Sequence, residues 1–117
     1  MHEFSVAESI LSFCGREREK QQAEEIRAVH LLIGVMSGID IQLLREAFEA
    51  LKHKRGFAKT ELLTRQEEIS VACGQCGAGS RLMEMKFVCP ECGSENVRIA
   101  GGDKMLIEKI DLVRQKL

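Results

Sequence analysis

The sequence lacks any run of apolar residues that approaches the ~20 needed to cross a bilayer as a helix. Its first four residues have neither the basic start nor the long apolar stretch of a secretory signal. Lys and Arg total 17 against 18 Asp and Glu, so the net charge is -1 and no broad basic field exists. The one local excess, Lys52-His53-Lys54-Arg55, ends a predicted helix, where positive charge complements the helix dipole. These absences predict a protein that binds neither nucleic acid nor a membrane.

Aromatic residues are also scarce, and Phe87 is the only one near the paired cysteines, so rings that could stack on bases are few. Four of the five cysteines stand at metal-binding spacing and the fifth is unpaired. This usage fits a reducing cytoplasm better than an oxidising compartment, and we expect a cytoplasmic protein. A chain of 117 residues with 44% apolar residues can build one small domain with a smaller module set into it.

Two Cys-x-x-Cys pairs are the most informative feature that is present. Each pair is followed at once by a glycine, and the ligands are Cys73, Cys76, Cys89 and Cys92. Two intervening residues let both thiolates of a tight turn point at one ion, and the glycine permits the turn. Four soft thiolates in a tetrahedron suit Zn²⁺, although such a site can also hold iron. Because four thiolates leave no open position for water, we expect this zinc to be structural.

Apolar periodicity predicts two helices. The first covers residues 5 to about 21, with Ser5 and Glu8 as a capping box. Cys14 lies on its apolar stripe, so we expect an inert core thiol. The second helix begins at Asp40, a plausible cap, and stops before Gly56.

Alternating apolar residues predict three strands, at residues 26–33, about 59–68 and 104–113. The alternation of the last strand slips by one residue, which predicts a β-bulge at Glu108-Lys109. The predicted fold class is therefore α+β, with two helices packed on a three-stranded sheet and an inserted zinc-ribbon module built on four cysteines. We expect residues 1–69 plus 100–117 to form the α+β domain and residues 70–99 to form the zinc-binding module.

The amino terminus carries a second set of metal ligands. The free amine of Met1 and the amide and imidazole nitrogens of His2 can close adjacent chelate rings around one ion. A fourth donor can come from Glu3 or a nearby side chain. This planar, nitrogen-rich set suits Ni²⁺ or Cu²⁺ rather than tetrahedral Zn²⁺. The helix dipole disfavours a cation at this end, but deprotonated amide ligands and Glu3 offset its charge.

The chain begins Met1-His2-Glu3-Phe4-Ser5-Val6-Ala7-Glu8-Ser9-Ile10, which closely resembles the opening of the hydrogenase nickel-incorporation proteins, the HypA/HybF family. The resemblance runs the length of the chain. Further matching segments are Gly34-Val35-Met36-Ser37-Gly38, Cys73-Gly74-Gln75-Cys76-Gly77, Cys89-Pro90-Glu91-Cys92-Gly93-Ser94, and the glycine pair before a closing strand that ends Ile110-Asp111.

The resemblance implies a cytoplasmic nickel metallochaperone that delivers Ni(II) to the large subunit of [NiFe]-hydrogenase. It implies cooperation with HypB, a GTP-hydrolysing nickel protein, and in some organisms service to urease and its accessory proteins. In the family's pattern His2 is the nickel ligand, with Met1 and Glu3 contributing amine or backbone nitrogen, and the four paired cysteines hold structural zinc. The pattern contains no catalyst, and this chain shows no nucleophile–base pair.

The main alternative function is a zinc-ribbon adaptor that binds nucleic acid or a transcription or translation complex. Its binding would weaken steeply with salt, and the even charge balance disfavours it. A rubredoxin-like electron carrier would hold iron at the four thiolates. An enzyme is disfavoured because neither His30 nor His53 has a carboxylate or serine partner close to it in the sequence.

Overall fold

The computed structural model describes residues 2–114. The chain forms two helices, α1 (Glu3–Lys20) and α2 (Ile41–Lys52), and six strands. The strands are β1 (Ala23–Gly34), β2 (Glu61–Glu67), β3 (Ser70–Cys73), β4 (Gly79–Arg81), β5 (Val97–Gly101) and β6 (Met105–Arg114). Among these described residues no helix is both long and apolar enough to span a membrane.

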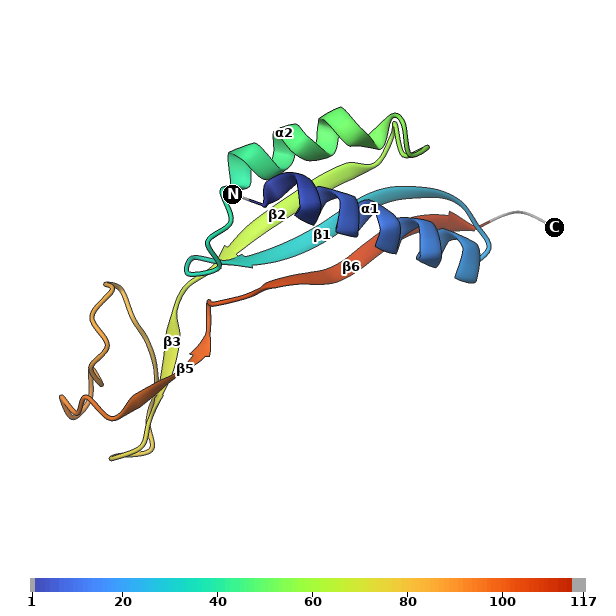
Figure 1. Ribbon diagram of the computed structural model, residues 1–117. Helices are drawn as coiled ribbons and strands as arrows, with labels where there is room; N and C mark the ends of the chain where they lie inside the picture. The colour runs from blue at the N-terminus through green and yellow to red at the C-terminus, as the bar shows by residue number, and fades with distance from the viewer. Residues whose placement is uncertain (1, 115–117) are drawn as a thin grey trace. The chain divides into compact units, whose positions relative to one another are not determined.

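The larger sheet has the strand order β2-β1-β6, and α1 and α2 pack against each other above it (Figure 1). Strand β2 runs in the same direction as β1, and β6 runs against it, so the sheet is mixed. The segment that carries the four cysteines leaves the sheet after β2 and returns as β6. The predicted α+β class, with its inserted cysteine module, is therefore confirmed.

The first helix starts earlier than its sequence pattern predicts, and the predicted Ser5–Glu8 capping box is wrong. Helix α1 begins at Glu3, with His2 as N-cap and no side-chain cap, so Ser5 lies inside the first turn. A tertiary contact accompanies this start: the Glu3 carboxylate is buried and accepts a hydrogen bond of 3.0 Å from the Asp40 amide. A local capping motif cannot indicate such a long-range bond.

Most other local expectations are confirmed. The side chain of Asp40 caps α2 by accepting from the Leu43 amide at 3.1 Å. Cys14 is fully buried on the apolar stripe of α1, and burial raises its pKa to about 11, as expected for an inert thiol. Burial along β6 changes phase between Ile107 and Ile110, where a bulge is predicted; the bulge itself stays a prediction.

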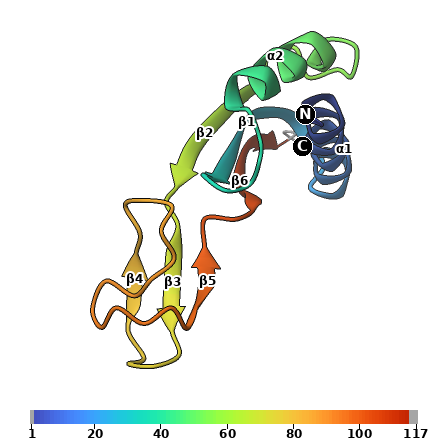
Figure 2. The same ribbon diagram turned by 60° about the vertical axis from the view of Figure 1, so that its left-hand side comes forward.

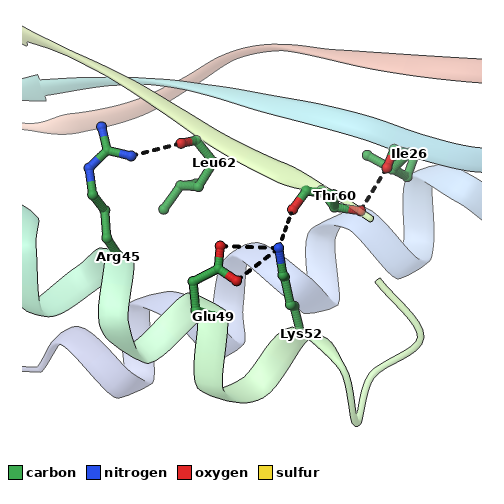
Figure 3. A network of polar contacts seen from close by, with 6 residues as sticks. All are labelled: Ile26, Arg45, Glu49, Lys52, Thr60 and Leu62. Carbon is green, nitrogen blue, oxygen red and sulfur yellow. Dashed lines mark hydrogen bonds and ion pairs between the residues drawn. The ribbon is translucent and has the colours of Figure 1, made fainter. Parts of the chain in front are cut away.

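Polar side chains fasten α2 to the strands below it. Lys52 is buried, and its ammonium donates to the Thr60 carbonyl at 3.0 Å while pairing with Glu49 at 2.9 Å. The Thr60 hydroxyl in turn donates to a β1 carbonyl at 2.6 Å. Figure 3 shows the residues of this network: Ile26, Arg45, Glu49, Lys52, Thr60 and Leu62. Because a buried charge is tolerated only with such partners, the network fixes α2, and with it Asp40, against the strands.

The chain divides into two compact units. The first comprises residues 1–31, 38–64 and 107–117, and the second comprises residues 32–37 and 65–106. The second unit contains a small antiparallel sheet of order β4-β3-β5 (Figure 2). Its core is small: Ile69, Val71 and Leu82 are buried, with Met36 and Val97 packed against them. Met36 comes from the turn after β1, so this unit draws on a segment far from the cysteines.

Backbones approach closely where the turn after β1 meets the segment before β6. A Cβ atom on Gly34 would lie 2.2 Å from the Gly102 carbonyl oxygen, and one on Gly102 would lie 2.6 Å from the Glu68 oxygen. Gly102 also has φ +89, and its carbonyl accepts from the Met36 amide at 2.8 Å. Glycine is therefore required on both sides of this crossing.

We expect Gly34→Ala to destabilise the second unit by about 2 kcal/mol or more, because neither backbone can move without breaking hydrogen bonds. Thermal unfolding followed by circular dichroism, at fixed zinc concentration, measures the change. Gly15→Ala is the matched control, since nothing lies within 4 Å of its new methyl group. In α1 that change should be neutral or stabilising by up to about 1 kcal/mol. Equal melting temperatures for both variants would contradict the steric argument.

Candidate metal centres

The four predicted cysteines converge in the second unit. Their Sγ atoms all lie within 4.8 Å of one another, with Cys73–Cys92 and Cys76–Cys89 separations of 3.7 Å. A disulfide would need about 2.05 Å, so these are four separate thiols. A tetrahedron with Zn–S bonds of about 2.3 Å has S–S edges of about 3.8 Å. The donor set and spacing therefore fit a zinc ion with a closed shell, which suits a structural role.

Two equivalent turns present these thiols. In the first, the Gly77 amide donates to the Cys73 carbonyl at 3.1 Å and the Cys73 amide donates to Ala78 at 2.9 Å. In the second turn the Gly93 amide donates to the Cys89 carbonyl, and the Cys89 amide donates to the Ser94 carbonyl. Gly77 and Gly93 have φ +79 and +77, a region costly for residues with a Cβ. The glycine after each pair therefore has the role that the sequence predicted.

Backbone amides stabilise the thiolate form of Cys73. The Cys76 amide donates to its Sγ at 3.4 Å and the Gln75 amide at 3.3 Å, and these bonds lower the pKa of Cys73 to about 6. A metal ligand must be deprotonated, so donors aimed at sulfur prepare the site. Cys73 and Cys89 are buried, whereas Cys76 and Cys92 are exposed.

The predicted nickel ligands lie at the start of α1. Met1 is outside the described residues. His2 is exposed and adopts a left-handed conformation, φ 93 and ψ 16, while its carbonyl accepts from the Val6 amide at 2.9 Å. The hydrogen bond from the Asp40 amide is among the contacts that lower the pKa of Glu3, to about 2. His2 thus presents its imidazole to solvent, whereas the Glu3 carboxylate is ionised and held against α2.

The hydrogen bond from the Asp40 amide to the Glu3 carboxylate was not predicted from the sequence. The two are far apart in the chain, and a helix cap is a sufficient local explanation for an aspartate before α2. A 2.8 Å hydrogen bond between His30 on β1 and Asp111 on β6 was not predicted either, and this bond lowers the pKa of Asp111. This pair links two strands, and it lacks the nucleophile that a catalytic histidine–carboxylate pair would need.

A small α+β unit together with a small antiparallel unit that carries four converging thiols defines a class of metal-binding proteins. The family model for hydrogenase/urease nickel incorporation, metallochaperone, hypA, matches residues 1–112. The chain belongs to this family, whose members are nickel metallochaperones and not enzymes. That membership favours the metallochaperone over the zinc-ribbon adaptor, the main alternative function considered from the sequence.

Relatives match over nearly their whole length. The hydrogenase maturation factor HypA of Aquifex aeolicus (strain VF5) is 34% identical over 112 residues, covering 96% of this chain and 97% of that protein. The HypA of Syntrophus aciditrophicus (strain SB) is 35% identical over 106 residues, covering 91% and 93%. The solution structure of the nickel metallochaperone HypA from Helicobacter pylori has a TM-score of 0.73 and 28% identity, covering 98% of this chain and 100% of that one.

Proposed function

We propose that the chain carries Ni(II) on its first three residues, with the Met1 amine, the His2 amide and imidazole nitrogens, and a donor from Glu3 around the ion. The observation that carries this proposal is the position of His2, exposed immediately before α1. A planar set of nitrogen donors suits Ni(II). Because the hydrogen bond to Asp40 holds the Glu3 carboxylate, a donor from Glu3 is most readily its backbone nitrogen.

The acceptor of this nickel is proposed to be the large subunit of [NiFe]-hydrogenase during its maturation. The family description, hydrogenase/urease nickel incorporation, supports this class of acceptor and also supports supply to urease accessory proteins. Delivery in cooperation with the GTP-hydrolysing protein HypB, in the cytoplasm, is part of the same proposal, and the resemblance of the opening residues and both cysteine turns supports it. Free thiols at metal spacing agree with a reducing compartment.

Residues 1–69 with 100–117 are proposed to handle nickel, while residues 70–99 hold zinc through Cys73, Cys76, Cys89 and Cys92. Four thiolates leave the zinc no open coordination position for a substrate or water, so the ion would stabilise the fold of this segment. At the nickel end, an exposed ligand set at a chain terminus permits transfer by ligand exchange, one donor at a time. Protonation of the amine, amide or imidazole would release the ion, so nickel affinity is expected to fall as pH falls.

Adding one glycine before Met1 tests this arrangement. The new terminal amine moves away from the His2 imidazole and breaks the adjacent chelate rings, so nickel affinity should fall at least about tenfold. A titration that counts nickel and zinc per chain measures the effect, and zinc should remain at one per chain. A glycine added after Leu117 is the control and should change neither metal. Equal nickel affinity in both variants would require a different ligand set.

A further inference from the structure

The four converging thiols differ in their access to solvent. Cys76 and Cys92 are exposed, whereas Cys73 and Cys89 are buried. The Cys92 sulfur contacts the Cys73 sulfur at 3.7 Å, and the Cys76 sulfur contacts the Cys89 sulfur at the same distance. Each of these two contacts therefore joins an exposed thiol to a buried one, and each joins the first cysteine turn to the second.

Thiols held this close are suited to oxidation as well as to zinc. A disulfide has an S–S bond of about 2.05 Å, so each contact would have to close by about 1.7 Å. Rotation about the first side-chain torsion moves a cysteine sulfur by a distance of this order without moving the backbone. The two contacts span 19 and 13 positions of the chain, so a disulfide at each would connect the two turns in place of the ion.

We propose that the zinc centre is also a peroxide-responsive disulfide switch, which releases its zinc when it is oxidised. The disulfides form between the thiols already in contact, Cys73 with Cys92 and Cys76 with Cys89. This reactivity does not depend on nickel carriage by the amino terminus, so it goes beyond the proposed function.

Each pair reacts in two steps. The exposed thiolate attacks a peroxide oxygen, the O–O bond breaks, hydroxide leaves, and the sulfur is oxidised to a sulfenic acid. The buried thiolate of the same pair then attacks that sulfur, the S–O bond breaks, and a second hydroxide leaves as the disulfide forms. Two peroxide molecules thus convert the four thiolates into two disulfides and four hydroxides, and the zinc loses all its ligands.

The oxidised form should keep the second unit folded without metal. The backbone bonds inside each turn, from the Cys73 amide to Ala78 and from the Cys89 amide to Ser94, do not involve the ion. Disulfides between the turns restrict the unfolded chain and so replace the restraint that the shared ion provides. A dithiol reductant returns the four thiols, which can then bind zinc again.

Tryptic digestion distinguishes this pairing from pairing within each turn. Trypsin cleaves after Lys and Arg, so the first cysteine turn lies in peptide 66–81 and the second in peptide 87–98. Zinc-loaded protein is treated with hydrogen peroxide, released zinc is measured with a chelating dye, and remaining thiols are alkylated before digestion without reductant. We expect one zinc to be released for every two disulfides, and the two peptides to be joined. Fragmentation by mass spectrometry should then connect Cys73 to Cys92.

Cys14→Ala is the control variant. Cys14 is buried in α1 and is not among the four converging thiols, so the variant should release zinc and form both disulfides as the unaltered protein does. Amide NMR spectra of the oxidised, zinc-free protein should keep the signals of a folded second unit. Protein stripped of zinc by a chelator under reducing conditions should lose those signals.

Three results would overturn the inference. The first is two separate peptides, each lighter by two hydrogen atoms, because the disulfides would then lie within the turns. The second is a disulfide between Cys73 and Cys89, which would contradict the assigned partners. The third is zinc that stays bound in excess peroxide, or that leaves with sulfinic or sulfonic acids in place of disulfides.

Discussion

Cys76→Ala is expected to abolish zinc binding and to unfold the second unit while α1 and α2 stay folded. Zinc supplies ~10 kcal/mol or more of apparent folding free energy in small zinc domains. The apolar core available to replace it is small, with three buried side chains, Ile69, Val71 and Leu82, and two partly buried ones. Removal of one thiolate leaves three ligands and an open position, so the ion is held weakly. Zinc content by elemental analysis, together with amide NMR spectra, measures both effects.

Cys14→Ala is the matched control for that experiment. Cys14 is buried in α1 and is not among the four converging thiols, so its loss should leave zinc at one ion per chain. Any effect should be limited to a small loss of stability in the first unit. The scaffold role of zinc would be refuted if Cys76→Ala lost its zinc and still gave the amide spectrum of a folded second unit.

His2→Ala is expected to abolish nickel binding without changing zinc content. Removing a group that only orients a metal ligand typically lowers metal affinity about 10–100-fold. Removing the ligating imidazole itself should therefore lower nickel affinity by more than about 100-fold. His2 forms the N-cap of α1 without a side-chain cap bond, so alanine should leave the helix intact. Isothermal titration with nickel, on protein already saturated with zinc, gives both the affinity and the stoichiometry.

His53→Ala provides the comparison for the loss of an imidazole. His53 is an exposed histidine at the C-terminal end of α2, and its substitution should leave nickel affinity unchanged. If His2→Ala retained nickel while His53→Ala lost it, the ligand assignment would be wrong. Tight nickel binding in both variants would place the ion away from these histidines altogether.

Local patterns were sufficient to predict the helices, the strands of the larger sheet and the cysteine turns. The Cys-x-x-Cys-Gly motif predicts its own geometry because the ligands and the positive-φ glycine are adjacent in the chain. The cap at Asp40 was predicted for the same reason, since its acceptor oxygen and the Leu43 amide are three residues apart.

Long-range contacts account for what was missed. The burial of Glu3 depends on Asp40, and the packing of Met36 depends on residues beyond 65, so no local window contains either cause. The buried Lys52 could not be predicted from its position in a basic helix end, because its partner Thr60 lies in a different element. Charge that looks solvated in sequence can be buried when the fold provides an acceptor.

The course of the chain through its two units has a practical consequence. The polypeptide passes from one unit to the other at residues 31–32, 37–38, 64–65 and 106–107, so each unit is assembled from separate pieces. A fragment cut at residues 70–99 would omit Met36 and Ile69, both of which belong to its interior. The cysteine segment therefore cannot be exchanged between relatives by itself. Such an exchange also requires the short turn after β1, which contributes Met36 to the second unit.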